Sequence, residues 1–473
     1  MTVLSCATPE KMGVHSEWII NLIKKMSKWE YLHQFSIVRH SQVIATGCFA
    51  PYSKADKHHL FSGTKTMTSF ALGLLYDRGI VGLDDKVLKF FPEIQVSDDK
   101  WERMTIRHLL TMSSGHAICP MLSAYNTVKS HDFVKIFFEA PLKYEPGEFF
   151  VYNTCATYII SEIIKRSSNK DMADWLQEEI FSEMGIKDVS FLRVDNGVPV
   201  GGVGGFIRHD DWTKFNLLLL NYGKYDGKQL ISEEYMRMAS SKQIDNSHNP
   251  GDSMNWKIGY GFQIWMNELD GFRADGAYGQ YALCFPKLDL LFMINSGTAE
   301  MGKLGELIAS EFVSKLSPDD TELPENPQAY NELQQLCAAL KIPVLSEEVN
   351  DASLIGKQSF KCDFKGIKRI DFNGRNSVKI TLNDERVIAW QIGSCEYVIN
   401  EFYDLENNKR KYAIAGHYLE SGDFEIVAFD LNSVYRITYL CKIDGDKLRI
   451  KRDIKLTLLN GNWDRELEGE LIS

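Results

Sequence analysis

The feature that most constrains the fold is a change in hydrophobic pattern about two thirds of the way along the chain. Up to residue 316, helical periodicity dominates, and strand patterns occur only near the two ends of this region. From about residue 357 to 471, short alternating segments such as Ser377-Val-Lys-Ile-Thr-Leu382 follow one another between turns such as Asn407-Asn408. Residues 317–330 lie between the two patterns, and their three prolines and several acids are typical of a linker.

This change predicts an α+β protein in two parts, which agrees with a length of 473 residues. We expect a first domain at residues 1–316, a linker with a short helix at 317–345, and a C-terminal domain at 346–473. The regular spacing of short strands predicts that the C-terminal domain is an antiparallel, barrel-like β module. We find no set of catalytic residue types in it.

Composition excludes several classes of protein. A formal net charge of −11, with no run rich in Lys or Arg, argues against nucleic-acid binding. No stretch reaches the ~18 apolar residues of a membrane span. The nine cysteines are scattered without a metal-ligand spacing, so no metal, cofactor or disulfide framework is expected. Since the N-terminus does not resemble a signal peptide, we expect a cytoplasmic protein.

Strand patterns frame a long helical block in the first domain. We expect a helix at 16–28 and two strands within 34–48, and then three strands at 260–265, 280–285 and 289–295. The helices expected between and after these strands are 62–76, 106–112, 130–139, 156–166, 171–184, 210–222, 232–240 and 301–316. The two groups of strands predict one antiparallel sheet beside a helical lobe, with a cleft between them.

Ser62-Gly-Thr-Lys65 is the strongest candidate for chemistry. A serine hydroxyl needs a base to accept its proton. On a helix, residues at i and i+3 share a face, so the Lys65 amine reaches the Ser62 hydroxyl. Burial can keep such a lysine uncharged enough to act as that base. The alternative is a serine at a helix start with a lysine on the surface.

The Ser-x-x-Lys spacing alone is weak evidence for catalysis, because Ser97-Asp-Asp-Lys100 and Ser167-Ser-Asn-Lys170 share it. Both of these lie in polar, loop-like surroundings, where a lysine keeps its ordinary pKa. Ser62 instead begins a helix with an apolar continuation, and the start of a helix presents N–H groups to a developing oxyanion.

Four segments in sequence order resemble the N-terminal part of class C β-lactamase-like hydrolases, which include D-Ala-D-Ala carboxypeptidases, penicillin-binding proteins and esterases. The resemblance covers about residues 8–315 and implies the β-lactamase/transpeptidase-like fold and a bacterial serine hydrolase. The segments are Phe61-Ser-Gly-Thr-Lys65, Asp77-Arg-Gly-Ile-Val-Gly-Leu-Asp-Asp85, Phe91-Pro-Glu93 and Ile106-Arg-His-Leu-Leu-Thr-Met-Ser-Ser-Gly115.

The family's second motif, Tyr-x-Asn, corresponds to Tyr152-Asn153-Thr154 after Pro146-Gly147. The resemblance implies that Tyr152 shuttles a proton between the serine and the leaving group. Thr154 replaces the family's asparagine. Asn153 is a candidate substrate contact, although adjacent side chains on a turn point in different directions, so Asn153 does not simply replace the family's asparagine. The alternative for Tyr152 is a packed core aromatic.

The third motif, Lys-Thr-Gly or His-x-Gly in the family, corresponds to Ala274-Asp275-Gly276. Gly276 matches the glycine that permits close approach of the substrate, and Ala277 would supply the second oxyanion N–H with that of Ser62. Asp275 is a candidate substrate contact without an assigned role. Ala274 replaces the cation. The alternative for Gly276 is an ordinary turn glycine.

We expect structural rather than catalytic roles for two other features, the histidine pair before Ser62 and a glycine-rich segment. His58 and His59 precede the nucleophile, and a Ser-His-Asp triad is conceivable, but we expect them to lie along the approach to Ser62. Residues 201–205 are rich in glycine but lack a Walker lysine, so we expect backbone packing near the cleft.

The sequence therefore predicts an acyl-enzyme serine hydrolase with Ser62, Lys65 and Tyr152 as its catalytic residues. The expected partner is a small ester, amide or D-amino-acid peptide, and homo-oligomer formation is left open. The two substitutions, at 154 and 274, make efficient β-lactam hydrolysis a weaker prediction. Two alternatives remain: a catalytically inactive, penicillin-binding-like binding protein, and a carrier function in the C-terminal module.

Overall fold

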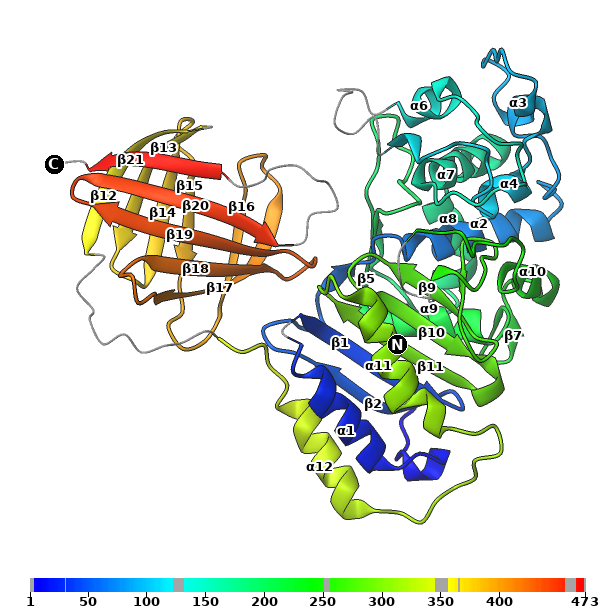
Figure 1. The fold of residues 1–473 in the computed structure, drawn as a ribbon, viewed down its shortest axis with the longest axis horizontal. Helices are drawn as coiled ribbons and strands as arrows, with labels where there is room; N and C mark the ends of the chain where they lie inside the picture. Colours follow the sequence, from blue (N-terminus) through cyan, green and yellow to red (C-terminus); the bar gives the residue numbers. More distant parts are fainter. Residues whose placement is uncertain are drawn as a thin grey trace.

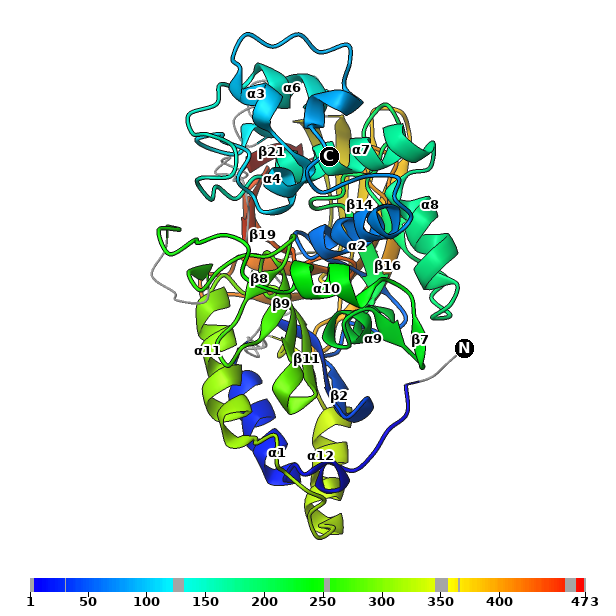
Figure 2. The ribbon, with the colours of Figure 1, turned by 90° about the vertical axis from the view of Figure 1, so that its right-hand side faces the viewer.

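The computed structural model describes residues 4–29, 31–121, 132–250, 256–344, 356–364, 366–455 and 465–471. Two bodies lie side by side (Figure 1): a mixed helix-and-sheet part formed by the first two thirds of the chain, and an all-β part formed by the last third. Figure 2, turned by 90°, shows the helical lobe above the sheet, helix α11 beside it, and helices α1 and α12 below it.

The helices of the described residues are η1 (Glu10–Met12), α1 (Ser16–Met26), α2 (Thr64–Asp77), η2 (Val87–Phe90), α3 (Lys100–Arg103), α4 (Ile106–Leu110), α6 (Phe133–Glu139), α7 (Thr154–Ser168), α8 (Met172–Leu176), the π-helical turn η3 (Gln177–Phe181), α9 (His209–Leu220), α10 (Glu233–Ala239), η5 (Pro286–Leu288), α11 (Met301–Glu311), η6 (Val313–Lys315) and α12 (Pro327–Ala338). The strands of the first part are β1 (Leu32–Arg39), β2 (Gln42–Cys48), β3 (Lys57–His59), β4 (Ser190–Phe191), β5 (Gly205–Arg208), β6 (Lys224–Tyr225), β7 (Lys228–Gln229), β8 (Trp265–Met266), β9 (Phe272–Gly276), β10 (Gln280–Phe285) and β11 (Leu290–Ser296).

The central sheet joins the two ends of the first part. Within the described residues its order is β2-β1-β11-β10-β9-β8, and the pairs β1–β2, β1–β11, β10–β11, β9–β10 and β8–β9 are antiparallel. Every residue of β1 and β11 is buried, because helices cover both faces of the sheet. On one face Phe35 and Ile37 pack with Ile19 of α1 and Ile308 of α11. This confirms the predicted antiparallel sheet and the β-lactamase-like fold class.

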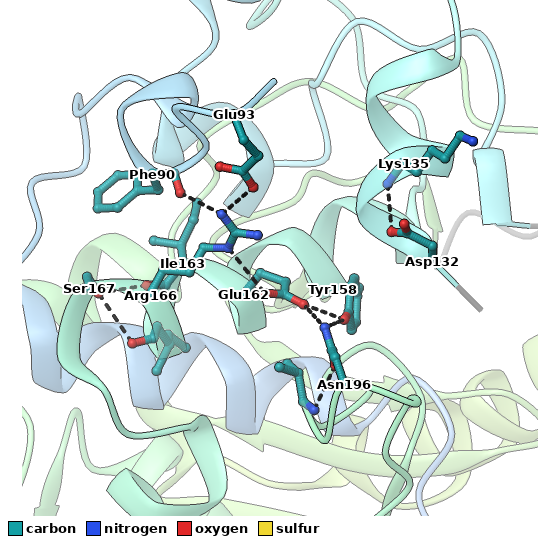
Figure 3. Close-up of polar contacts among 12 residues, drawn as sticks. Phe90, Glu93, Asp132, Lys135, Tyr158, Glu162, Ile163, Arg166, Ser167 and Asn196 are labelled. Atoms are coloured by element: carbon teal, nitrogen blue, oxygen red, sulfur yellow. Dashed lines mark hydrogen bonds and ion pairs between the residues drawn. The ribbon is translucent and has the colours of Figure 1, made fainter. Parts of the chain in front are cut away.

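Helix α7 runs through the core of the helical lobe, and the segment that enters it carries part of the candidate site. A polar network ties its outer end to its neighbours (Figure 3). The buried Glu162 carboxylate accepts hydrogen bonds from Tyr158 and from Asn196 at 2.7 Å. Arg166 bonds Glu162 and, at 2.6 Å, Glu93. A buried carboxylate with all its partners present holds α7 in place.

The all-β part forms one strongly curved antiparallel sheet, as the alternating pattern predicts. In the described residues its order is β15-β14-β13-β12-β21-β20-β19-β18-β17-β16, which brings the first and last strands close to each other in a barrel-like, nearly closed shape. Its strands are β12 (Lys357–Phe364), β13 (Ile367–Asn373), β14 (Ser377–Leu382), β15 (Val387–Gln391), β16 (Val398–Tyr403), β17 (Lys409–Tyr418), β18 (Phe424–Asp430), β19 (Arg436–Asp444), β20 (Lys447–Lys455) and β21 (Arg465–Leu471).

Several elements differ from the sequence-based expectation. Residues 260–264 are not a strand, because their backbone bends and the regular pairing starts only at Trp265 in β8. The helix expected at 171–184 ends its α-helical part at Leu176 and continues as a π-helical turn. Helix α12 begins at Pro327, inside the stretch 317–330 that is typical of a linker, with Asn326 as its cap. Residues 130 and 131 of the predicted helix 130–139 lie outside the described residues.

All nine cysteines, which lie in the described part of the chain, are free thiols, and five of them are buried. None of the described helices combines the length and the apolar character that crossing a membrane requires.

Candidate active site

Ser62 lies in a tight turn between strand β3 and helix α2. The turn is closed by hydrogen bonds from the N–H of Gly63 to Leu60 O at 3.0 Å and from the N–H of Thr64 to Phe61 O at 3.1 Å. The N–H of Ser62 takes no part in these bonds. Phe61 has a φ of +47°, a left-handed backbone conformation that is unusual for a bulky residue. This conformation turns the chain sharply, so that Ser62 is partly exposed just before the helix begins.

The Lys65 side chain contacts Ser62, as the spacing predicts, although Ser62 lies in the turn before helix α2. Its Nζ lies 3.1 Å from Ser62 Oγ, 3.1 Å from Thr154 Oγ1 and 2.6 Å from Gly202 O. Lys65 is only 1% exposed. Burial lowers its pKa from 10.5 to about 7, and the Cys119 thiol and the Asp275 carboxyl offset this only in part. Near neutral pH, much of the Lys65 population is therefore an uncharged amine next to the Ser62 hydroxyl.

The two other Ser-x-x-Lys spacings lack this arrangement. Lys100 bonds Asp98, and Lys170 bonds Glu178. Their side chains are 26% and 47% exposed, so water stabilises their charge. Burial therefore distinguishes Lys65 from the other two lysines.

Tyr152 faces Ser62 from the opposite side of the site, just before helix α7. Its hydroxyl forms a hydrogen bond with the Ser62 side chain, and burial raises its pKa above the ordinary value. Its ring stacks on Trp265, and Lys65 Nζ lies 4.8 Å from the ring centroid. Tyr152 is therefore a neutral phenol at physiological pH, and it contacts the oxygen whose proton must move.

Residues 153 and 154 point in different directions. The Asn153 side chain is buried and caps helix α7, since its Oδ1 accepts from the N–H of Ala156 at 3.2 Å and its Nδ2 donates to Ser114 Oγ. The helical lobe thus uses the Asn153 amide. Thr154, which stands where the family has asparagine, instead brings its hydroxyl to Lys65.

The third motif lies at the end of strand β9, against the Ser62 turn. A Cβ added to Gly276 would lie 2.1 Å from Leu60 O and 3.1 Å from the N of Gly63. Only glycine allows these two segments to approach so closely. The partly buried Ala277 follows directly, so its N–H lies beside the nucleophile turn.

Asp275 is buried in a neutralised pair beside this motif. Its Oδ2 accepts from Arg273 Nε at 2.8 Å and from Trp256 Nε1 at 2.9 Å. Burial raises the pKa of the Asp275 carboxyl, which Arg273 and Trp256 oppose. Ala274, at the position of the family's cation, is fully buried and apolar.

The two histidines before Ser62 make contacts inside the fold. His58 Nε2 lies 2.8 Å from His33 Nδ1, and His59 Nε2 lies 2.6 Å from Val203 O. Burial lowers the pKa of His58 to about 3 and that of His59 to about 4. Both are therefore neutral at physiological pH.

The glycine-rich segment 201–205 packs directly against helix α2. A Cβ on Gly201 would lie 2.4 Å from Thr68 Oγ1, and the N–H of Gly205 donates to Thr64 Oγ1 at 2.9 Å. The sequence reasoning missed two Lys65 partners, the Gly202 carbonyl and the Thr154 hydroxyl. The sequence held two signals for these partners: the run of glycines at 201–205 and the threonine at the position where the family has asparagine.

Comparisons with known proteins agree with this geometry. The beta-lactamase family model matches residues 33–307, so the chain belongs to the beta-lactamase family. Penicillin-binding protein 4* of Bacillus subtilis is 26% identical over 29% of this chain and 31% of its own length. Lovastatin esterase of Penicillium rubens is 24% identical over 32% of this chain and 44% of its own length. The match therefore spans less than half of each relative.

The likeness in fold extends further than the likeness in sequence. The solved structure of the octameric penicillin-binding protein homologue from Pyrococcus abyssi matches 95% of this chain and 99% of its own, with a TM-score of 0.50 and 17% identity. The likeness in fold to this homologue therefore extends over both parts of the chain. Within the described residues, no group of three or more His, Cys, Asp or Glu side chains could hold a metal.

Proposed function

We propose that this protein is a serine hydrolase that forms an acyl-enzyme on Ser62. One observation carries the proposal: the buried Lys65 amine, with a pKa of about 7, lies 3.1 Å from Ser62 Oγ. A neutral amine accepts the hydroxyl proton. The contacts of Lys65 Nζ with Thr154 Oγ1 and Gly202 O hold the amine in place beside Ser62 Oγ. The Tyr152 hydroxyl on the same oxygen supports the proposal.

The steps follow from the positions of these groups. Lys65 accepts the Ser62 proton while Oγ bonds to the substrate carbonyl carbon, and the negative charge moves to the carbonyl oxygen. The N–H groups of Ser62 and Ala277 donate to that oxyanion. Tyr152 donates a proton to the leaving group as its bond to carbon breaks, and is reprotonated from Lys65. Water then attacks the carbonyl carbon of the acyl-enzyme while Lys65 accepts its proton. The bond to Ser62 Oγ breaks, Oγ takes the proton back, and the acid is released.

The proposed substrates are small esters, amides or D-amino-acid peptides. Among these, the chemistry of the site favours substrates that carry no charge. Strand β9 brings Ala274 rather than a cation, and the Arg273 charge is taken up by Asp275. A substrate carboxylate, as in β-lactams, therefore has no charged partner on this strand. An esterase is among the relatives, which supports an ester as the substrate.

The test is the hydrolysis of p-nitrophenyl esters by single and combined variants. Because the three groups act as one unit, Ser62→Ala, Lys65→Met and Tyr152→Phe should each lower kcat by at least a hundredfold, nearly as much as the triple variant. Ser97→Ala and Lys100→Met, from a matched Ser-x-x-Lys spacing, should remain active. Turnover that survives Ser62→Ala would exclude Ser62 as the nucleophile, and no turnover by the wild type would favour a binding protein instead.

A further inference from the structure

A turn of the C-terminal sheet reaches the nucleophile. Residues 431–435 join strands β18 and β19, and the turn is closed on itself. The N–H of Asp430 donates to Tyr435 O at 3.0 Å, and the N–H of Asn432 donates to Asp430 Oδ1 at 3.0 Å. Leu431, Ser433 and Val434 are buried. The turn is therefore a rigid feature of the sheet rather than a loose loop.

The same turn extends the small sheet that leads to Ser62. Strand β3 pairs with β5 on one side. On the other side, the N–H of His59 donates to Asn432 O at 2.8 Å, and Asn432 Nδ2 donates to Lys57 O at 2.9 Å. Ser62 follows β3 by three residues, so the C-terminal part fixes the strand from which the nucleophile turn departs.

Val434 completes an apolar cluster around the two candidate oxyanion donors. Phe61, Tyr278 and Val434 form a buried cluster, with Ala277 and Tyr435 packed against it. The Phe61 and Tyr278 rings meet edge to face at 5.4 Å, and the Phe61 and Tyr435 rings lie 6.5 Å apart. The cluster joins the residue before Ser62 to the residue after Ala277.

Both of these residues have a strained backbone. Phe61 has a φ of +47° and Tyr278 has a φ of +67°, values that bulky side chains adopt only when their surroundings enforce them. On the first part's own side, Ser296 Oγ donates to Tyr278 O at 2.6 Å. On the other side Val434 belongs to the same buried cluster as Phe61 and Tyr278, and its carbonyl oxygen lies 3.1 Å from where a Cβ on Gly297 would be.

We infer that the C-terminal sheet supplies positioning residues to the active site. Val434 and Tyr435 hold Phe61 and Tyr278 in their left-handed conformations, and thereby direct the N–H groups of Ser62 and Ala277 toward one point. The inference rests on the proposed function, since it assigns the oxyanion donors their alignment. It also gives the C-terminal module a role that no motif in its sequence indicates.

Kinetics of full-length variants test the inference. Val434→Ala and Tyr435→Ala should lower kcat for p-nitrophenyl esters at least tenfold with little change in KM, because the donors act on the oxyanion and not on the bound ester. Tyr435→Phe, which keeps the ring, should restore kcat. The matched controls Val387→Ala and Tyr403→Ala change half-exposed side chains of the same sheet and should leave kcat unchanged.

Hydrogen exchange separates this inference from the proposed function. In Val434→Ala and Tyr435→Ala, the amides of residues 61–64 and 276–279 should exchange faster, while those of strand β1 keep their protection. Unchanged exchange at both segments, or unchanged kcat in an active enzyme, would overturn the inference. Faster exchange in the two variants, combined with a wild type that shows no Ser62-dependent turnover, would uphold the positioning role and reject the hydrolase.

Discussion

At the scale of single residues, the environment of Lys65 decides what the site can do. Its amine is surrounded by the Ser62 hydroxyl from the turn before α2, the Thr154 hydroxyl from α7 and the Gly202 carbonyl from the glycine-rich segment. None of these is a carboxylate, so burial is not offset by a directly bonded anion. A lysine in such a position loses its proton several pH units more easily than one in water.

The pH profile should report this lysine. Since the base must be neutral, kcat/KM should rise as pH increases through about 7 and then level off. Burial raises the pKa of Tyr152 above its ordinary value of about 10, so no fall from phenol ionisation is expected below that pH. Initial rates from pH 5 to 9.5 measure the profile. A flat profile across pH 6–8 would contradict a role for Lys65 as the base.

Thr154 offers a matched pair of variants for the same measurement. Thr154→Val removes a hydroxyl that stabilises the charged ammonium, so the rising limb should move to lower pH. Thr154→Ser keeps the hydroxyl and should leave the limb in place. Equal profiles for the two variants would show that the hydrogen bond to Lys65 has no influence on its protonation.

Sequence patterns predicted the contact between Ser62 and Lys65 better than the other groups around it. Ser62 and Lys65 are three residues apart across the start of α2, so helical spacing was enough to predict their contact. Thr154 and Gly202 reach Lys65 only through tertiary packing, and no spacing in the sequence relates them. The direction of the Asn153 side chain likewise depends on its place as the cap of α7.

At the scale of elements, the site depends on a close approach of strand β9 to the turn before α2. Two groups of residues that are more than 200 positions apart in the sequence touch there, and Gly276 makes the approach possible. The third motif of the sequence contains Gly276, the last residue of this strand. It did not show that residues 260–264 bend instead of forming a strand, because their alternating apolar pattern also suits a buried loop segment.

Gly276→Ala tests this approach. The new Cβ would lie 2.1 Å from Leu60 O, so the backbone must shift. We expect a loss of stability of about 1–3 kcal/mol and a fall in kcat of at least a hundredfold. Chemical denaturation and ester hydrolysis measure the two effects. Gly82→Ala is the control, since its Cβ would meet no atom nearer than 3.6 Å. Equal activity of both variants would refute the need for a glycine.

At the scale of the whole molecule, the C-terminal sheet is fixed to the first part by apolar and charged contacts. Phe429 and Leu431 belong to the same core as β1 and α1. Lys411 Nζ lies 2.6 Å from Asp56 Oδ1 across the junction. The alternating pattern predicted the β module and its curved sheet, but side-chain patterns say nothing about which end of a module docks where.

Asp430 makes the stability of this junction depend on pH. Burial raises its pKa from 3.8 to about 6, so the folded protein holds a proton there that the unfolded chain has lost between these values. This stabilising effect is complete below pH 3.8 and is lost as the pH rises through about 6. Asp430→Asn, which mimics the protonated form, should therefore stabilise the protein at pH 8 by an amount on the order of 1–3 kcal/mol.

Calorimetry at two pH values checks this expectation. The Tm of Asp430→Asn should exceed that of the wild type at pH 8, and the difference should shrink at pH 4.5. Asp423→Asn, a change to an acid of the same sheet outside the junction, serves as the control. A difference in Tm that is the same at both pH values would show that the Asp430 charge is not its cause.

The central claim is that Ser62 carries the acyl group, and intact mass spectrometry tests it most directly. The protein is mixed with a p-nitrophenyl ester and quenched in acid within the first turnovers. The wild type should gain the mass of one acyl group, located by digestion on the peptide that contains Ser62, and Ser62→Ala should gain none. An equal gain in both proteins, or turnover of the ester by Ser62→Ala, would contradict the claim.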